Sequence, residues 1–172
     1  MTAVTNVKVK LSGSNMLVAA MIGVQRHVQN TFNGARPAHG LKPGESVWDL
    51  AIDGAVAELA VAKAMDKHWD GALGNYDAAD VGQFQVRSTR HADGHLIVHD
   101  SDDSDAIFIL VLSGAAPIYE IAGWKFGGDA KNGKYRVERR PGHPCFWVPQ
   151  SDLEPFEELQ RFRWKLDRGG RQ

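Results

Sequence analysis

The run AIFILVLSG, residues 106–114, constrains the fold more than any other stretch, because nearly every side chain in it is apolar. Such a run is typical of the central strand of a β-sheet. A neighbouring strand is predicted at 117–127, and the other predicted elements are strands at 7–12, 81–91, 95–99 and 145–150 and helices at 14–30 and 47–68. The expected fold is α/β (α+β), with a central mixed β-sheet flanked by helices.

Length and composition indicate a single domain. The chain has 172 residues, of which 43% are hydrophobic, and this is enough for one sizeable core. Within 1–172 we expect an N-terminal strand, helix and loop (1–46), a core (47–150) and a C-terminal helix and tail (151–172). Ser151 and Glu154 have the spacing of a capping box in front of that last helix.

Two features bear on the setting of the protein. Cys145 is the single cysteine, which excludes an intramolecular disulfide and indicates a reducing cytoplasm. The apolar run at 16–24 is too short to cross a bilayer. It is interpreted as part of a core helix capped by Ser14 or Asn15.

The stretch DVGQFQVRST, residues 80–89, alternates as a half-buried strand does. Residues two apart on a strand share a face, so Phe84 and Val86 are expected in the core. Gln85 and Arg87 then share the other face. If Asp80 lies at the mouth of this strand, a carboxylate, an amide and a cation converge there, which is the outline of a metal and phosphate site.

The predicted helix at 47–68 carries an acid inside its apolar stripe. Glu58 falls among Val47, Leu50, Ala55 and Met65, and its neighbours three and four residues away include no basic side chain. A carboxylate that faces inward needs a neutralising partner, and a metal ion would be one. The alternative is a carboxylate at the edge of the stripe that reaches solvent.

Together these residues resemble the PD-(D/E)XK, or restriction-endonuclease-like, nuclease superfamily. The family has a Glu on its first core helix, an Asp about twenty residues later and a strand with acid-x-Lys-Ser/Thr; here they are Glu58, Asp80 and the run Gln85-Val86-Arg87-Ser88-Thr89. The resemblance covers about residues 47–150 and is strongest to small phage and prophage members. It implies Mg²⁺ or Mn²⁺ held by Glu58, Asp80, Gln85 and the Val86 carbonyl.

The motif departs from the family at two positions. Gln85 stands where the third acid is usual, and Arg87 stands where lysine is usual. Arg87 can stabilise negative charge but cannot act as a base, because it stays protonated. An alternative for Arg87 is structural: if Asp93-Gly94 forms a two-residue hairpin turn, Arg87 faces Asp100 in a cross-strand ion pair.

The charge distribution suggests where nucleic acid would bind. The net charge is −1, but residues 125–172 hold 11 Lys and Arg against 7 Asp and Glu, a local excess of 11 − 7 = 4. With Arg87 and Arg90, Lys125 and Lys131 are the candidate contacts to phosphates, the last two beside a short helix expected in GWKFGGDAK. A solvated basic face is the alternative.

Weaker candidates are interpreted structurally. The run DSDDSD at 100–105 lacks the glycine of a calcium loop and is expected to be an acidic turn. His91, His95 and His99 are split by the predicted turn. Cys145, two residues from His143, is expected in the core.

The leading hypothesis is a metal-dependent phosphodiesterase, a nuclease acting on DNA, in which Glu58, Asp80, Gln85 and Arg87 are catalytic. It would work in the cytoplasm, that of a bacterial host if the chain is phage-encoded. The alternative is a catalytically inactive nucleic-acid- or protein-binding module with the same fold. A structural virion component is a third class, which gives no reason for Glu58. A homodimer is left open.

Overall fold

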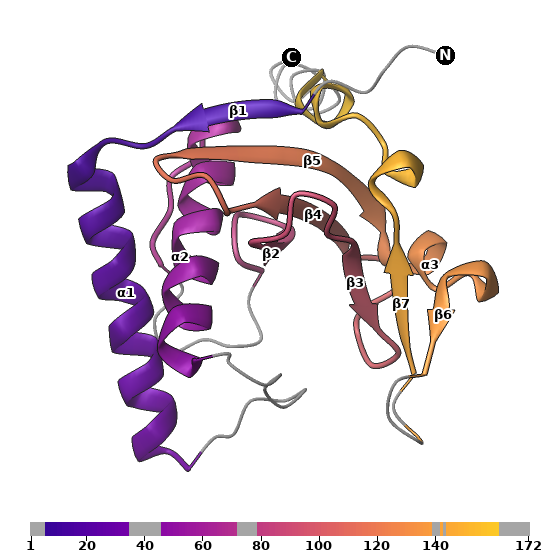
Figure 1. Cartoon of the computed structure of the whole chain (residues 1–172), viewed down its shortest axis with the longest axis horizontal. Coiled ribbons are helices and arrows are strands. Elements are labelled where there is room, and N and C mark those ends of the chain that lie inside the picture. The colour runs from indigo at the N-terminus through magenta and orange to yellow at the C-terminus, as the bar shows by residue number, and fades with distance from the viewer. Residues whose placement is uncertain (1–5, 35–45, 72–78, 139–141, 143, 162–172) are drawn as a thin grey trace, which may run out of the picture.

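The computed structural model describes residues 6–34, 46–71, 79–138, 142 and 144–161, and Figure 1 shows their arrangement. The elements are β1 (Val7–Lys10), α1 (Gly13–Phe32), α2 (Val47–Ala64), β2 (Phe84–Thr89), β3 (Leu96–His99), β4 (Ile107–Leu112), β5 (Ile118–Phe126), α3 (Gly127–Ala130), β6 (Arg136–Val137) and β7 (Cys145–Val148), with 3₁₀ turns η1 (Gly133–Tyr135) and η2 (Gln150–Asp152). Residues 156–161 are helical.

The strands form two sheets, so the chain belongs to the mixed α and β class. The larger sheet has the order β1-β5-β4-β2, in which β2 and β4 are parallel and the other pairs are antiparallel. The smaller sheet, β3-β7-β6, is antiparallel throughout. Figure 1 shows α1 and α2 on one side of the larger sheet and the smaller sheet on the other.

Strand β4 explains why its sequence is apolar at every position. Ile109 and Val111 belong to the cluster under α1 and α2, whereas Phe108 and Leu110 belong to the cluster under the smaller sheet. Successive side chains of a strand point to opposite faces, so a strand covered on both faces needs a continuous apolar run. The prediction of a central strand here is confirmed.

Helix α2 lies between α1 and the larger sheet, which makes its buried surface wider than one stripe. Residues 55–58 and 60–62 are all buried, including Glu58. A Cβ on Gly23 would lie 2.6 Å from the Ala51 carbonyl oxygen, so the glycine allows α1 to approach α2 closely. Leu50, expected in the core, is instead 46% exposed in the first turn of α2.

The cap of α1 lies earlier than predicted. Ser12, and not Ser14 or Asn15, is the N-cap: its Oγ accepts from the Asn15 N–H at 3.1 Å, and Asn15 Oδ1 accepts from the Ser12 N–H at 3.4 Å. Asn15 therefore completes the capping box from inside the helix. No helix in the described ranges combines the length and apolar content that crossing a membrane requires.

The predicted hairpin between residues 81–91 and 95–99 is wrong. The turn itself forms, because the Gly94 N–H donates to the His91 carbonyl at 3.0 Å. However, β2 pairs with β4, and β3 pairs with β7 in the other sheet. Phe84 and Leu96 accordingly enter different apolar clusters, so the turn carries the chain from one sheet to the other.

The predicted capping box of Ser151 and Glu154 is also wrong. Glu154 exchanges both backbone hydrogen bonds with Trp124 of β5, at 3.0 and 2.9 Å, and the helical residues begin only at 156. Gly123 makes this contact possible: it has φ of 149°, and a Cβ there would lie 2.6 Å from the Glu154 carbonyl oxygen. Residues 153–155 therefore form a strap across β5.

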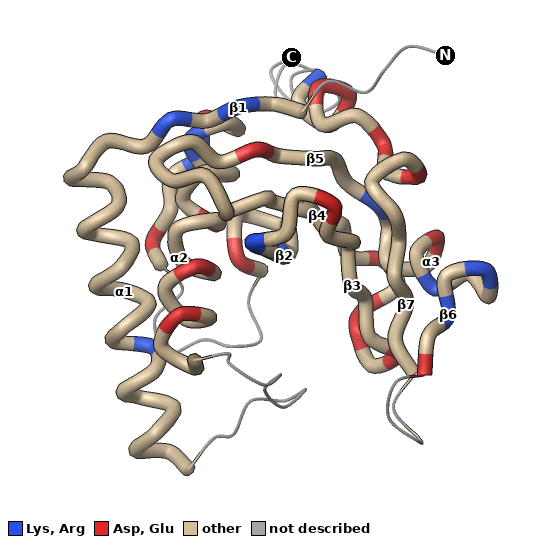
Figure 2. Tube along the Cα trace, viewed as in Figure 1, with Lys and Arg blue, Asp and Glu red and all other residues tan. Residues whose placement is uncertain are grey.

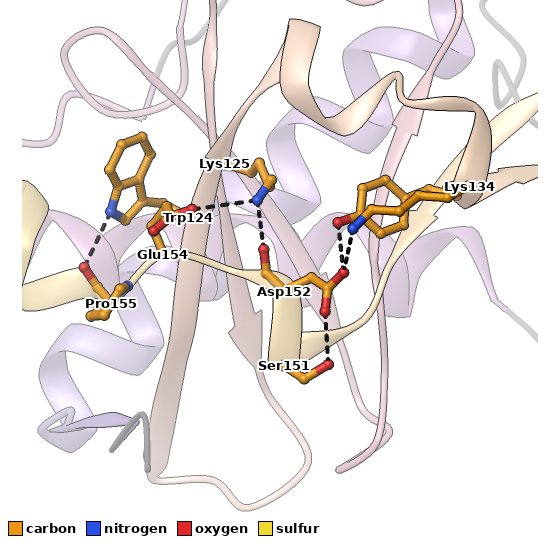
Figure 3. A network of polar contacts seen from close by, with 8 residues as sticks. Trp124, Lys125, Lys134, Ser151, Asp152, Glu154 and Pro155 are labelled. Atoms are coloured by element: carbon orange, nitrogen blue, oxygen red, sulfur yellow. Dashed lines mark hydrogen bonds and ion pairs between the residues drawn. The ribbon is translucent and has the colours of Figure 1, made fainter. Parts of the chain in front are cut away.

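Asp152 anchors the strap, as Figure 3 shows. Its carboxylate accepts from the Tyr135 hydroxyl at 2.7 Å and from Lys134 Nζ at 3.0 Å, while its carbonyl accepts from Lys125 Nζ at 2.6 Å. The Tyr135 hydroxyl, followed by Lys134 and Ser151, lowers the pKa of Asp152 to about 2. The network ties β5 of the larger sheet to the chain that follows β7.

Candidate functional site

Asp80 lies at the open edge of the larger sheet. β2 is the last strand of that sheet, and its partner β4 lies on one side only. The Val86 N–H donates to Asp80 Oδ2 at 2.7 Å. An edge strand has backbone donors without a strand partner, and this carboxylate satisfies one of them. Asp80 therefore has a structural role at the strand that carries the motif.

The alternation of β2 is as predicted. Phe84 and Val86 are buried in the cluster beneath the helices, at 1% and 9% exposure. Gln85 and Arg87 are half-buried on the opposite face. Glu58, on α2, belongs to the helical side, so the motif residues are divided between the two faces of the edge strand.

Glu58 has a basic partner from another helix. Arg26 of α1 forms a bidentate pair with it, Nη1 to Oε1 at 2.6 Å and Nη2 to Oε2 at 2.7 Å. Trp69 Nε1 also donates to Oε2, at 3.0 Å. The prediction that Glu58 faces inward is confirmed, and the neutralising group is a guanidinium.

Asp80 is electrostatically coupled to this pair. Burial, and next the negative charge of Glu58, raise the pKa of Asp80 from 3.8 to about 6. The Val86 N–H and the charges of Arg87 and Arg26 act in the opposite direction. Thus Asp80 feels groups on both faces of β2. Perturbed carboxyl groups of this kind cluster at functional sites but also occur in structural ion-pair networks.

Arg87 does not pair with Asp100, so that sequence-based alternative is wrong. The missing hairpin is the reason, because β3 does not lie beside β2. Arg87 Nη2 instead lies 3.3 Å from Asp102 Oδ2, and its guanidinium sits 5.0 Å from the centroid of the Phe108 ring. The His99 N–H fixes the same Asp102 carboxylate at 2.9 Å.

The donor set does not fit a resident Mg²⁺ or Mn²⁺ ion. Within the described ranges, no three His, Cys, Asp or Glu side chains form a group suited to a metal. Both oxygens of Glu58 are held by Arg26, whose positive charge would repel a cation placed beside them. The remaining ligands would be Asp80, the Gln85 amide and the Val86 carbonyl, and of these only Asp80 carries a negative charge. Hard cations bind largely through ligand charge, so this set would hold one weakly.

The other predicted phosphate contacts are occupied within the chain. Arg90 Nε donates to Asp53 Oδ2 at 2.5 Å, and Nη1 lies 3.6 Å from Asp49. Lys125 is held by the strap. Lys131, after the short helix α3, donates to the Asp100 and Asp102 carbonyls and to Ser104 Oγ. Figure 2 shows basic and acidic positions interspersed along the trace.

The weaker candidates have structural roles. Residues 100–105 form turns and bends, as expected, and Lys131 contacts their oxygens. The His95 ring lies 5.7 Å from Trp147, whose Nε1 donates to Cys145 Sγ at 3.2 Å. His143 lies outside the described residues.

The sequence analysis missed three residues of this region: Arg26, Trp69 and Asp102. One signal was present for Arg26, which is the single Lys, Arg, Asp or Glu residue of α1. A charged side chain that is buried is almost always paired, so this residue is the one on α1 that could neutralise a buried acid. Nothing comparable distinguishes Trp69, or Asp102 among its acidic neighbours.

Comparisons with protein-family models, with curated proteins and with solved structures find no significant match to this chain.

Proposed function

We propose that this chain is a protein-binding module with a restriction-endonuclease-like core, in which the nuclease-type motif has become part of the framework. One observation carries the proposal: the helix acid of the motif, Glu58, gives both of its oxygens to Arg26 in a buried pair. A carboxylate held in this way stabilises the packing of α1 on α2 and is not an open ligand. Arg87, paired with Asp102, is likewise engaged.

A protein partner is favoured over nucleic acid. Each basic side chain expected to contact phosphates has an acidic or carbonyl partner in the chain. By contrast, large apolar side chains are exposed on α1 and at the start of α2, among them Leu17, Met21, Phe32 and Trp48. Contiguous exposed apolar surface is typical of protein contacts.

The second candidate is a metal-dependent nuclease acting on DNA. The observation that favours it is the pKa of Asp80, which the nearby Glu58 helps to raise. Two repelling carboxyl groups are what a divalent cation would relieve. This candidate requires Arg26 to release Glu58.

Plasmid nicking across a Mn²⁺ titration, beside calorimetry, separates the two candidates. The variants are Asp80→Asn, which removes the remaining charged ligand, and Gln85→Glu, which restores the third acid. A binding module predicts no nicking by any of the three proteins and no Mn²⁺ heat that depends on Asp80. Cleavage by the wild type that Asp80→Asn abolishes would establish the nuclease.

Duplex DNA binding is measured on the same preparations over a salt series. A protein-binding module predicts no binding at moderate salt. Affinity that falls steeply with salt would identify a nucleic-acid partner, because each neutralised phosphate releases counterions.

A further inference from the structure

Helix α1 exposes an apolar face on the side away from α2. We call it the outer stripe, and its members, with their exposed fractions, are Leu17 (63%), Val18 (54%), Met21 (62%), Val24 (37%), Val28 (38%) and Phe32 (87%). The opposite side of the helix is already used, because Ala19 and Gly23 are buried. In Figure 1, α1 forms the outer edge of the molecule. A helix that packs on one side usually keeps its other side polar, so the stripe needs a partner.

The spacing within the stripe is compatible with a second helix as the partner. Leu17, Met21, Val24 and Val28 follow one another at intervals of four, three and four, which is the a/d pattern of a coiled coil. Val18 and Phe32 widen the stripe at the flanking positions. At 1.5 Å per residue, the segment from 17 to 32 extends about 22 Å. A seam of this length and period accepts another helix with the same pattern.

Charge favours a second copy of the chain as the source of that helix. Arg26 is the single Lys, Arg, Asp or Glu residue of α1, and it is paired with Glu58. Two copies of the stripe therefore meet without like charges between them. The net charge of −1 adds almost no long-range repulsion between chains.

A membrane surface fits this helix less well. Interfacial helices carry Lys and Arg on the face opposite their apolar one. On α1 that face is packed against α2, and it contributes one arginine that is already paired.

We infer that two copies of this chain associate through α1, with the outer stripe of each packed against that of the other about a two-fold axis. This names the partner of the proposed protein-binding module and rests on that proposal. It also assigns a role to the exposed apolar face of α1.

Size-exclusion chromatography with light scattering tests the inference on the full chain. The wild type should have the mass of a dimer at micromolar concentration. Leu17→Glu/Met21→Glu places two carboxylates in the seam and should give a monomer, while circular dichroism and the melting curve report that it is folded. Ile118→Glu is the matched control: Ile118 is also 40% exposed but lies on β5, so this variant should remain a dimer.

Cross-linking provides a second test that does not require a charged substitution. Single cysteines at positions 17, 21 and 24, in a Cys145→Ser background, should give a disulfide-linked dimer for at least one position, because the seam residues nearest the two-fold axis approach within bonding range. A monomeric wild type, a dimeric Leu17→Glu/Met21→Glu variant, or no cross-link at all three positions would each overturn the inference. None of these outcomes involves metal or DNA, so they are distinguishable from a failure of the proposed function.

Discussion

Two aspartates in this molecule have pKa values that their surroundings shift in opposite directions. Asp80 is half-buried at the open edge of the larger sheet, and burial, followed by the negative charge of Glu58, raises its pKa to about 6. Asp152, which anchors the strap over β5, accepts from Tyr135, Lys134 and Ser151, and its pKa is lowered to about 2. Positive charges act on both carboxyl groups, yet their pKa values are shifted in opposite directions.

The two carboxylates differ in the hydrogen-bond donors and positive charges that lie close to them. Donors converge directly on Asp152, so its charged form is satisfied. Asp80 accepts from the Val86 N–H, while the two positive charges that act on it, those of Arg87 and Arg26, are paired with Asp102 and Glu58. Asp80 therefore has few hydrogen-bond donors and shares nearby positive charge with other acids, whereas the carboxylate of Asp152 has several donors of its own. Each prediction below tests one side of this contrast.

The largest effect is expected at Arg26. Arg26→Met leaves Glu58 buried without its cation and should lower the free energy of unfolding by about 3 to 5 kcal/mol. Arg26→Met/Glu58→Met should recover most of that loss, because a buried ion pair can be replaced by apolar groups of similar volume. Urea denaturation measures both.

The control for this prediction is an exposed pair. Lys8 and Glu120 lie 3.3 Å apart with the Lys8 side chain 66% exposed, and Lys8→Met should cost less than about 1 kcal/mol. If Arg26→Met lowers the free energy of unfolding no more than Lys8→Met does, the buried charge of Glu58 does not depend on Arg26 for neutralisation.

The next effect is a pH dependence due to Asp80. Its pKa is raised on folding, so between about pH 4 and 6 the folded state binds more protons, and the free energy of unfolding falls as pH rises. The expected fall is up to about 3 kcal/mol. Asp80→Asn should lack it, and the test is the difference in the free energy of unfolding between the two proteins in urea at pH 3 and pH 7, each about one unit outside that window.

Asp152 provides the opposite sign for comparison. Its pKa is lowered, so its contribution to stability is complete above the unfolded value of 3.8 and is lost as pH falls through about 2. Asp152→Asn should therefore differ from the wild type above pH 4 and converge with it in strong acid. Parallel pH profiles for Asp80→Asn and Asp152→Asn would contradict the contrast.

These residues also mark how much the sequence could predict. The inward face of Glu58 and the alternation of Phe84, Gln85, Val86 and Arg87 follow from the helical and strand periods, which are local properties. The partner of Glu58 is 32 residues away on another helix, and no period connects the two.

The predicted hairpin failed for a related reason. Asp93-Gly94 encodes a turn, and a turn forms, but a local signal does not state which strand lies beside β2. The two apolar clusters account for the strand pairing. β4 is buried on both of its faces and pairs with β2, whereas the side chains of β3 belong to the cluster under the smaller sheet. Because β3 does not lie beside β2, Arg87 pairs with Asp102 and not with Asp100.

A smaller effect is expected where the strap crosses β5. Gly123→Ala places a Cβ 2.6 Å from the Glu154 carbonyl at a φ of 149°, and it should cost about 1 to 3 kcal/mol. Gly54→Ala is the matched substitution: nothing lies within 4 Å of its added Cβ, and the helix interior should gain about 0.5 to 1 kcal/mol. Thermal unfolding that shifts in the same direction for both variants would refute the strap contact.

The smallest effect is expected at Tyr135. Tyr135→Phe removes the largest cause of the lowered pKa of Asp152, which should rise toward 3.8. Lys134→Met should also raise it, since Lys134 contributes both a hydrogen bond and a positive charge. Carboxyl chemical shifts followed by NMR through an acid titration measure both, and an Asp152 that titrates unchanged in Tyr135→Phe would contradict the network.

The central claim is that Glu58 is committed to Arg26 and holds no metal. A crystal structure of the wild type soaked in Mn²⁺, with anomalous diffraction recorded to locate the ion, tests it most directly. A bidentate Arg26–Glu58 pair and no manganese peak between Glu58 and Asp80 are expected. A manganese ion bound by both carboxylates, with the Arg26 guanidinium displaced, would contradict it.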